Sequence, residues 1–541
     1  MSRNNNPVIV AGSSIGQVSA ETDDEFLVEC FVDHPVLEEI SNPDSPKMIV
    51  LGNTGVGKTA MLRMVERKKE KCMRIEIDEL SLNYVSNSDV IKFLHAIDVP
   101  TDRFFQALWK HIVCLEYIKL RYRVSNEDKS RSFFDRLREH FIADGAKQKA
   151  LKYLERWDNK FWVNFDESAA EVTKQLENDI SGSVGVELEK FKADAGYTKK
   201  ISETKKQHLQ QRLKKFVDAD LLSELAGVIN LLAEYNENEN NCQYVLIDRL
   251  DENWVDANLR FRLIRSLIEA LKSMRRIRDL KVIVALRADL MEKVILETKE
   301  EGFQSEKYSD YVARLTWSHD QLKTVVNKRI NFLFRRKYTK ENVFFEDIFP
   351  DKISKEKPFP YVLDRTLHRP RDAISFVNYC LGQAAGKTVV NQTAAVSATR
   401  LYSAGRLEAL VDEWRSVFPA IEPSIGVLRG RVQSFPLSEL HTSDTVNQLM
   451  NDLFDRPQYQ LDPLFGILDK SMNLGDGDGI FKVLRELIQR LHLIGAIGVN
   501  VAPSEPIHWF YKTQHRVPVA TISLASKIRV HPMLHSALAI R

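Results

Sequence analysis

Residues 52–59 read GNTGVGKT, directly after the apolar run Met48–Leu51 and directly before a stretch with apolar residues at helical spacing. The pattern G-x-x-x-x-G-K-[ST] between a buried strand and a helix is that of a phosphate-binding loop. Its glycines let backbone N–H groups point at phosphate oxygens, and the helix N-terminus adds partial positive charge. A chance match on a surface turn is the alternative, which the flanking strand and helix disfavour. The sequence therefore predicts a nucleotide phosphate site.

Each residue of this loop has an expected role at that site. Lys58 is expected to bridge the β- and γ-phosphates and to assist catalysis by neutralising their charge, and the Thr59 hydroxyl to coordinate magnesium. The residues expected to bind the nucleotide are those of the loop itself: Gly52, Asn53, Thr54, Gly55, Val56, Gly57, Lys58 and Thr59.

Further apolar runs predict the neighbouring strands of a parallel sheet, because strands buried on both faces are apolar throughout. These runs are residues 74–77, 244–247 and 282–286, and residues 314–317 predict a short fifth strand. Roughly 160 residues separate the second strand from the third, far more than a crossover needs. We therefore expect an inserted domain there.

The insertion is expected to be mostly helical. Apolar residues recur at helical spacing near its start, at Phe105, Leu108, Ile112 and Leu115, and a second amphipathic helix is predicted over residues 221–235. Between them, residues 182–197 alternate apolar and polar side chains, which predicts a small hairpin.

The third predicted strand ends in three acidic residues. Four apolar residues deliver Asp248 to the carboxyl edge of the sheet, where it is expected to hold magnesium through water. Asp251 and Glu252 follow, and one of them is expected to orient or deprotonate the attacking water. We prefer Glu252, with Asp251 as the alternative. Both acids could instead cap the helix that begins near Asp256.

Arginines at two other places are candidates for sensing the nucleotide. Arg287 follows the fourth strand, where it can reach the γ-phosphate, although an ion pair with Asp289 would also explain it. Arg369 and Arg371 flank Pro370 at the start of a later helix and are expected to reach the nucleotide from a helical lid, unless they are only solvated.

Composition fits a large globular chain rather than a polyanion binder. The 541 residues carry a formal net charge of only +2, and hydrophobic residues make up 44%. The five cysteines are scattered without paired spacing, which favours a reducing, cytoplasmic location over a disulfide framework or zinc site. No window is long and apolar enough for a membrane helix, so no membrane partner is expected.

The chain divides into six predicted parts. Before the loop we expect a helical segment whose one amphipathic helix covers about residues 21–40, and after the core we expect a capped lid helix from Ser318. A helix with Leu484 and Leu491, then a strand-like stretch through Trp509–Tyr511, predicts a winged helix. The parts are residues 1–46 (N-terminal segment), 47–84 with 241–317 (core), 85–240 (insertion), 318–385 (lid), 386–470 (helical connector) and 471–541 (winged helix).

Several motifs together resemble bacterial P-loop ATPases of the STAND and AAA+ initiator neighbourhood. They are GNTGVGKT, IDRLDENW, VIVALRADL, RLTWS, RPRDAISFVNYC, YSAGRLEALVDEWRSVFP and HPMLHSALAI. The spacing of Asp248, Asp251 and Glu252 is similar to a NACHT-type Walker B. The resemblance implies an α/β core of the ASCE type with strand order 5-1-4-3-2, a lid, a C-terminal winged helix and a homo-oligomer in the ATP state.

Function follows from the same resemblance, which implies ATP and Mg²⁺ as ligands and a switch role in antiphage defence. No effector domain or repeat array is recognisable, so a separate effector protein is the expected partner. The alternative is a DNA-binding initiator or repair ATPase. Glu486 and Glu505 interrupt the basic residues that would bind DNA, namely Lys482, Arg485, Arg490, Lys512, Arg516, Lys527 and Arg529.

Overall fold

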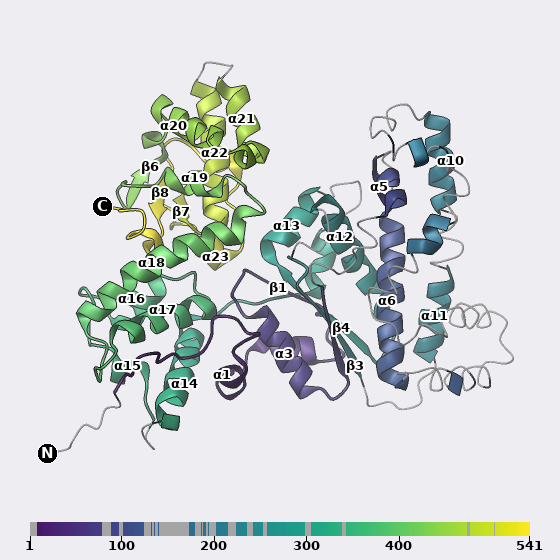
Figure 1. Ribbon diagram of the computed structural model, residues 1–541, viewed down its shortest axis with the longest axis horizontal. Coiled ribbons are helices and arrows are strands. Elements are labelled where there is room, and N and C mark those ends of the chain that lie inside the picture. The colour runs from purple at the N-terminus through teal and green to yellow at the C-terminus, as the bar shows by residue number, and fades with distance from the viewer. Residues whose placement is uncertain are drawn as a thin grey trace. The chain divides into compact units, whose positions relative to one another are not determined.

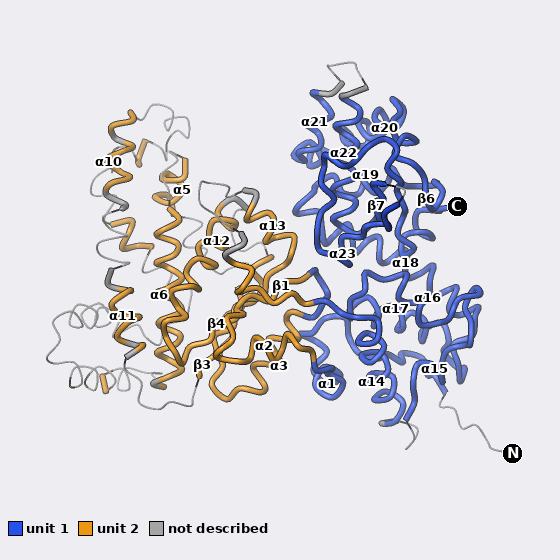
Figure 2. The backbone as a smooth tube through the Cα atoms, turned by 180° about the vertical axis from the view of Figure 1, so that it is seen from behind, with its two compact units in different colours: residues 1–33, 53–57, 316–541 blue, residues 34–52, 58–315 orange. Residues whose placement is uncertain are grey.

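The computed structural model describes most of the chain as two compact units (Figures 1 and 2). Unit 1 comprises residues 1–33, 53–57 and 316–541, and unit 2 comprises residues 34–52 and 58–315. The described residues are 8–77, 88–96, 101–123, 131–132, 135, 139, 173–178, 186, 188–190, 193, 202–214, 223–234, 242–252, 257–297, 305–337, 342–472, 477–502 and 504–541.

Unit 2 is built on a five-stranded parallel sheet of order β2-β3-β4-β1-β5. This is the expected 5-1-4-3-2 order read from the other edge, so the α/β, ASCE-like core is confirmed. Every residue of the strands β1 and β3 is buried, as their apolar sequences require. The strands are β1 (Ile49–Gly52), β2 (Cys72–Glu76), β3 (Gln243–Asp248), β4 (Leu280–Arg287) and β5 (Val312–Arg314).

The fifth strand lies slightly earlier than the sequence predicts. Val312 pairs with Ile49, and the register with β1 ends at Arg314 and Leu51. Residues after Leu315 are already needed to lead into the helix α14 (His319–Lys337). The expected strand over 314–317 is therefore wrong in its bounds, although the strand exists.

Helices cover both faces of the sheet, as Figure 1 shows. The chain crosses from β1 to β2 in one direction through α3 (Lys58–Lys68), but from β3 to β4 in the other through α12 (Ala257–Met274). Right-handed crossovers in opposite directions place their helices on opposite faces. The helix α13 (Ala288–Glu297) and the short turn η4 (Ser305–Tyr311) then lead from β4 to β5.

The described part of the insertion is helical. Its longest helix, α6, packs against α12, where Trp109 Nε1 donates to the Leu263 carbonyl at 2.9 Å. The hairpin expected over 182–197 is wrong where it can be compared, since positions 186, 188–190 and 193 are helical, and its other residues lie outside the described ones. The helices are α5 (Asp89–Ala96), α6 (Asp102–Tyr122), α10 (Glu203–Lys214) and α11 (Ser223–Glu234).

The single helix expected near the N-terminus is replaced by two short ones, α1 (Asp24–Glu29) and α2 (Pro35–Ser41). Proline disfavours helical backbone in the residue before it but suits the first turn of a new helix. His34 accordingly has extended backbone, and its Nδ1 accepts a hydrogen bond from Val36 N at 3.2 Å. Pro35 thus starts a second helix rather than continuing the first.

Helices dominate unit 1, whose first part carries the predicted lid. The expected capping box is present at the start of α14, where Ser318 N donates to Gln321 Oε1 at 2.8 Å and Gln321 N to Ser318 Oγ at 3.2 Å. Proline opens α17 as expected, with Arg369 as its N-cap residue. The helices after α14 are α15 (Phe345–Ile348), α16 (Pro358–Asp364), α17 (Pro370–Gln383) and α18 (Gln392–Arg415).

The last part of unit 1 joins helices to a small antiparallel sheet of order β6-β8-β7. The strand expected through Trp509–Tyr511 is wrong: His508 makes only a bridge to Val499, and Phe510 already starts a short helix. The elements are α19 (Ile421–Gly426), β6 (Ser434–Pro436), α20 (Ser443–Phe454), α21 (Pro463–Met472), α22 (Gly477–Leu493), β7 (Ile497–Asn500), α23 (Phe510–Thr513) and β8 (Lys527–Val530). No described helix is both long and apolar enough to cross a membrane.

Candidate functional site

The carboxyl edge of the sheet in unit 2 collects most of the predicted catalytic residues. Gly52 ends β1 in register with Arg287, which ends the neighbouring β4. Asp248 ends β3, which lies on the other side of β4. Parallel strands place their carboxyl ends at one edge, and ligands of open α/β sheets bind there. The sequence pattern therefore predicted a real juxtaposition of side chains.

Lys58 is the first residue of α3 and lies at this edge. Its Nζ donates to the Gly52 carbonyl at 3.1 Å. Burial lowers the pKa of Lys58 to about 8, and the nearby Asp251 carboxylate opposes this shift. An ammonium held among several charges with a reduced pKa is ready to gain from an added anion. This is the behaviour expected of a phosphate-binding lysine.

Asp248 is almost fully buried, with 4% of its surface exposed. One carboxylate oxygen accepts a hydrogen bond from Arg249 N at 3.0 Å, and the other is buried with no hydrogen-bond partner among the described residues. Burial raises the pKa of Asp248, while the Arg249 N–H and the Thr59 hydroxyl favour its charged form. A carboxylate oxygen left without a donor beside a threonine hydroxyl fits a hydrated magnesium ion.

The two candidate catalytic acids follow a strained turn. Arg249 has a φ of 62°, which is uncommon for a residue with a side chain. Beyond it, an Asp251 carboxylate oxygen lies 3.6 Å from Arg287 Nη1, whereas a Glu252 carboxylate oxygen lies 3.7 Å from Arg249 Nε. Among the carboxylates, Asp251 also has the largest influence on the pKa of Lys58. The geometry therefore favours Asp251, although the sequence favours Glu252.

Arg287 combines the two interpretations offered by the sequence. Its Nε and Nη2 donate to the two carboxylate oxygens of Asp289 at 3.0 and 2.9 Å, so the expected ion pair is present. Its Nη1 nevertheless faces Asp251. Arg287 is thus held in place by Asp289 and can respond to charge at the sheet edge.

The middle of the loop, residues 53–57, belongs to unit 1, where three of its consecutive carbonyls are bound. The Thr54 carbonyl accepts from Arg369 Nη1, the Gly55 carbonyl from Arg371 N at 3.4 Å, and the Val56 carbonyl from Trp317 Nε1 at 2.7 Å. Gly55 has a φ of 77°, and a Cβ on it would lie 3.0 Å from the Arg371 side chain. The loop therefore needs glycine at this position.

Arg369 belongs to a buried ionic cluster that also contains Asp372, Arg406 and Glu413. Its Nε lies 2.7 Å from Asp372 Oδ2 and its Nη2 lies 3.3 Å from Glu413 Oε1. Arg406 Nη2 lies 3.0 Å from the other oxygen of Glu413. Burial would raise the pKa of Glu413, but Arg369 and Arg406 hold it at about 2.

Sequence reasoning missed Trp317, Arg406 and Glu413. Each belongs to a motif that carries the family resemblance, RLTWS for the tryptophan and YSAGRLEALVDEWRSVFP for the other two. That was the only signal available, because none of them has a spacing that points to a phosphate site. Their contacts appear only when the chain is folded.

Arg371 differs from its neighbour. Its side chain is half-buried, and its Nε donates to the Val18 carbonyl at 3.3 Å. Burial and the charge of Arg369 lower its pKa, so an additional anion nearby would be favourable. Of the two predicted lid arginines, Arg371 is the one whose charge lacks an acidic partner within ion-pair distance in the described structure.

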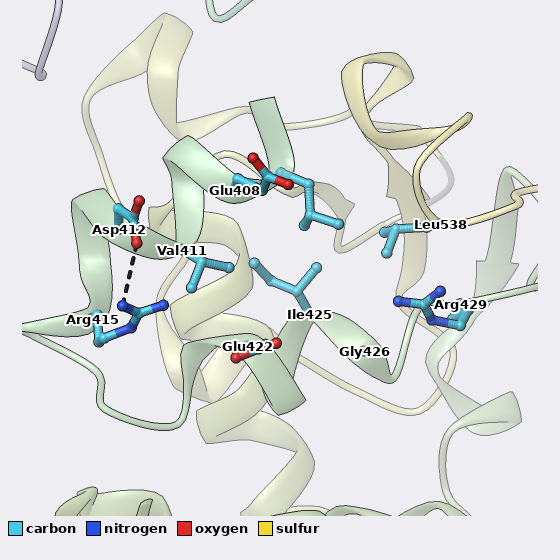
Figure 3. Close-up of a pocket in the computed structure, with 10 residues that line it drawn as sticks. Glu408, Val411, Asp412, Arg415, Glu422, Ile425, Gly426, Arg429 and Leu538 are labelled. Atoms are coloured by element: carbon cyan, nitrogen blue, oxygen red, sulfur yellow. Dashed lines mark ion pairs between the residues drawn. The ribbon is translucent and has the colours of Figure 1, made fainter. Parts of the chain in front are cut away.

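A pocket of about 320 Å³ lies elsewhere in unit 1, between α18 and α19, and holds none of the predicted site residues. Figure 3 shows Val411 and Ile425 at its centre with charged side chains around them. Asp412 and Arg415 pair with each other at its rim, 3.3 Å apart. The pocket therefore has an apolar floor and a rim whose charges are partly neutralised.

The basic residues near α22 do not form one surface. Arg490 is 1% exposed, and its guanidinium pairs with Asp462 at 3.1 Å and with Glu486 at 3.2 Å. Arg485 donates to the Ile522 carbonyl at 3.3 Å and lies over the Phe481 ring. Arg490 is therefore unavailable to bind DNA phosphates, contrary to its place among the predicted basic residues.

Comparison with known proteins finds a family model that matches part of unit 1 and a distant relative over most of the chain. Residues 320–411 match the FunZ-associated C-terminal helical domain. The chain is similar to the "Putative transposon gamma-delta 80.3 kDa protein" of Escherichia coli (strain K12), with 24% identity over 422 residues. This alignment covers 75% of the chain and 52% of that protein, so the chain spans about half the length of this relative.

A shorter similarity links the chain to a fungal protein. "Allergen Alt a 2" of Alternaria alternata is 30% identical over 128 residues, which are 23% of the chain and 67% of that protein. The aligned stretch therefore belongs to one family with that allergen, whose name states no biochemical activity. No solved structure matches the chain significantly.

Proposed function

We propose that this chain is an ATP-binding and ATP-hydrolysing regulatory switch. The proposal is supported by an ASCE-like parallel sheet in unit 2 and by the match of residues 320–411 to the FunZ-associated C-terminal helical domain. The role of the chain would lie in bacterial antiphage defence, with a separately encoded effector protein as partner and a homo-oligomer as the ATP-bound form. A transposon-borne relative is in keeping with a mobile, defence-associated gene.

One observation carries the ATPase proposal: the end of the GNTGVGKT loop lies at the carboxyl edge of a parallel sheet together with three charged residues at or just after the ends of other strands. The loop contributes Lys58, and the ends of the other strands contribute Asp248, Asp251 and Arg287. In this arrangement Lys58 binds the β- and γ-phosphates, and Asp251 orients the attacking water, with Glu252 as the second choice. Arg287 registers the γ-phosphate. Arg371 contributes a positive charge from the lid.

ATP and Mg²⁺ are the proposed ligands. The Thr59 hydroxyl and the buried oxygen of Asp248 would hold the ion, directly and through water. When bound, the ion neutralises charge on the phosphates. The lack of an Asn-Lys-x-Asp motif, which reads guanine, favours ATP over GTP.

Turnover by the purified full-length chain tests this proposal. Phosphate release from ATP should require Mg²⁺, stop on chelation by EDTA, and be much weaker with GTP. A protein that binds neither ATP nor ADP at millimolar concentration, in the presence of Mg²⁺, would overturn the proposal. Binding without turnover would instead leave a nucleotide-controlled scaffold.

A DNA-binding initiator or repair ATPase is the second candidate. The name of the transposon gamma-delta relative keeps it open, since transposition acts on DNA. The burial of Arg490 against Asp462 counts against a continuous basic surface at α22. The DNA role is therefore secondary to the switch role.

A further inference from the structure

We propose that Trp317 and Arg369 are positioning residues that hold the 52–59 loop in its phosphate-binding form, and that Glu413 fixes Arg369 for this purpose. The inference rests on the proposed nucleotide function. It adds that ATP affinity depends on residues outside the GNTGVGKT motif. The predicted lid would then shape the loop already in the nucleotide-free protein.

The direction of the carbonyls gives the first argument. In a trans peptide unit the C=O of one residue and the N–H of the next point in opposite directions. Bonds from Arg369, Arg371 N and Trp317 to three successive carbonyls therefore turn the N–H groups of residues 55, 56 and 57 away from those donors. Among these three amides, only Val56 N has a backbone partner in the described structure, a long bond of 3.4 Å to the Asn53 carbonyl. Inward-pointing amides are what a phosphate requires.

The hydrogen bonds and ion pairs of the Arg369 guanidinium give the second argument. All three of its guanidinium nitrogens are engaged, Nε by Asp372, Nη1 by the Thr54 carbonyl and Nη2 by Glu413. Only 2% of the residue is exposed. Burial opposes its charge, but the two carboxylates raise the pKa of Arg369 above its ordinary value. Arg369 is therefore fixed from both sides, and one of its three bonds supports the loop backbone.

Glu413 is the residue that fixes this arginine from another helix. Its carboxylate is shared between Arg369 and Arg406, and the two arginines with Asp372 and Glu413 carry no net charge. Loss of the Glu413 charge would leave a buried excess of positive charge, which is costly. Arg369 would then move to regain a partner, and its bond to the Thr54 carbonyl would weaken.

Trp317→Phe is the first test, since it removes the indole N–H and keeps an aromatic ring. Loss of one hydrogen bond to the loop should weaken ATP affinity by about fivefold. In the nucleotide-free protein, amides of residues 52–59 should exchange faster with deuterium. Trp509→Phe is the matched control, because Trp509 lies against His531 in the same unit and makes no hydrogen bond to the loop in the described structure.

Glu413→Gln is the second test and does not depend on the tryptophan variant folding. It keeps the shape of the side chain and should weaken ATP affinity by about tenfold, with the same faster exchange over residues 52–59. Glu408→Gln, on the pocket side of the same helix, should leave both measurements unchanged. A role of Glu413 in packing alone would lower Tm without selectively affecting exchange in the loop.

The outcomes separate this inference from the proposed function. If Lys58→Ala loses ATP binding while Trp317→Phe and Glu413→Gln bind ATP and exchange like the wild type, the positioning inference is wrong and the ATPase proposal stands. If the wild type binds no nucleotide, the ATPase proposal fails and this inference fails with it. If ATP affinity falls without a change in exchange, these residues act on the nucleotide and not on the loop, which also overturns the inference.

Discussion

The charged groups at the sheet edge of unit 2 and those at the start of α17 in unit 1 are of the same chemical kinds, but their surroundings differ. At the sheet edge, Asp248 has a buried oxygen with no hydrogen-bond partner among the described residues, and burial lowers the pKa of Lys58 to about 8. In the cluster that joins the start of α17 to α18, which is called the α17 cluster below, two arginines and two carboxylates neutralise one another, and the pKa of Glu413 is held at about 2.

We interpret this difference as one between groups at the sheet edge that can bind a ligand and groups in the α17 cluster that fix a local structure. Strained backbone and shifted pKa values are frequent at functional sites, and the sheet edge has both, at Arg249 and at Lys58. A closed ionic cluster instead fixes a single geometry, because breaking one pair leaves a buried charge. Substitutions at the sheet edge should therefore change ligand binding and chemistry directly, and those at α17 should act through the loop.

The largest effect is expected from Lys58→Ala. Loss of the ammonium that neutralises the β- and γ-phosphates should lower ATP affinity by at least about a hundredfold, since charge-assisted hydrogen bonds are strong. Titration with a fluorescent ATP analogue measures it. Lys68→Ala at the far end of α3 is the control, and its affinity should equal that of the wild type. A folded Lys58→Ala protein with unchanged affinity would contradict the assignment of the loop.

The next effect concerns the two acids after Asp248. Asp251→Asn should slow hydrolysis by at least about a hundredfold while ATP still binds, because it removes the carboxylate best placed to orient water. Glu252→Gln should have the smaller effect, since Glu252 pairs with Arg249 and Asp251 faces Arg287. Single-turnover phosphate release compares the two. The reverse ranking would restore Glu252 as the catalytic acid, which the sequence alone favoured.

The parts of the fold that the sequence predicted well are those set by local patterns. Continuous apolar runs identified β1, β3 and β4, and Asp248 follows such a run, so its position at the sheet edge is predictable. Capping and first-turn signals likewise located the starts of α14 and α17. In these places, local preference and tertiary structure agree.

Contacts between distant segments could not be predicted in this way. Glu413 follows Arg369 by 44 positions and reads, in the sequence, as one more acid on an exposed helix face. Trp317 reads as the end of a strand, yet its indole binds a loop 261 positions earlier. The preference for Glu252 over Asp251 rested on spacing alone, and that spacing does not reveal the left-handed backbone at Arg249, which precedes both acids in the structure.

A smaller effect is expected from pH, and it should appear at the sheet edge alone. Burial lowers the pKa of Lys58 to about 8, so the empty protein keeps the ammonium below that pH and loses it above. Phosphate binding needs the charged form. ATP affinity should thus be constant from about pH 7 to about pH 8 and then fall by up to about tenfold per pH unit.

Isothermal titration across this range measures the dependence, with Lys58→Arg as the control. An arginine stays charged, so its ATP affinity should not fall above pH 8 for this reason. In the α17 cluster the pKa of Glu413 is held at about 2, far below the range of the experiment. If the ATP affinity of Lys58→Arg falls above pH 8 with the same slope, another group is responsible for the titration. The contrast between the sheet edge and the α17 cluster would then lose this support.

The smallest effect is expected on DNA, for which binding should be weak and nonspecific. Arg490 resembles Arg369 rather than Lys58, because it is buried and paired with Asp462 and Glu486. The exposed basic residues that remain near the terminal sheet, Lys512 and Lys527 among them, are few for a phosphate-binding face. The dissociation constant for a random-sequence duplex should therefore stay above about a micromolar near physiological salt.

A salt series decides whether that expectation holds, because each phosphate contact steepens the fall of log affinity with log salt concentration. The informative variant replaces Lys512, Lys527 and Arg529 together, and leaves Arg490 intact because breaking its buried pairs would destabilise the fold. Submicromolar binding with a steep slope that this triple variant abolishes would show that unit 1 carries a ligand-binding face of its own. The initiator or repair role would then become the leading proposal.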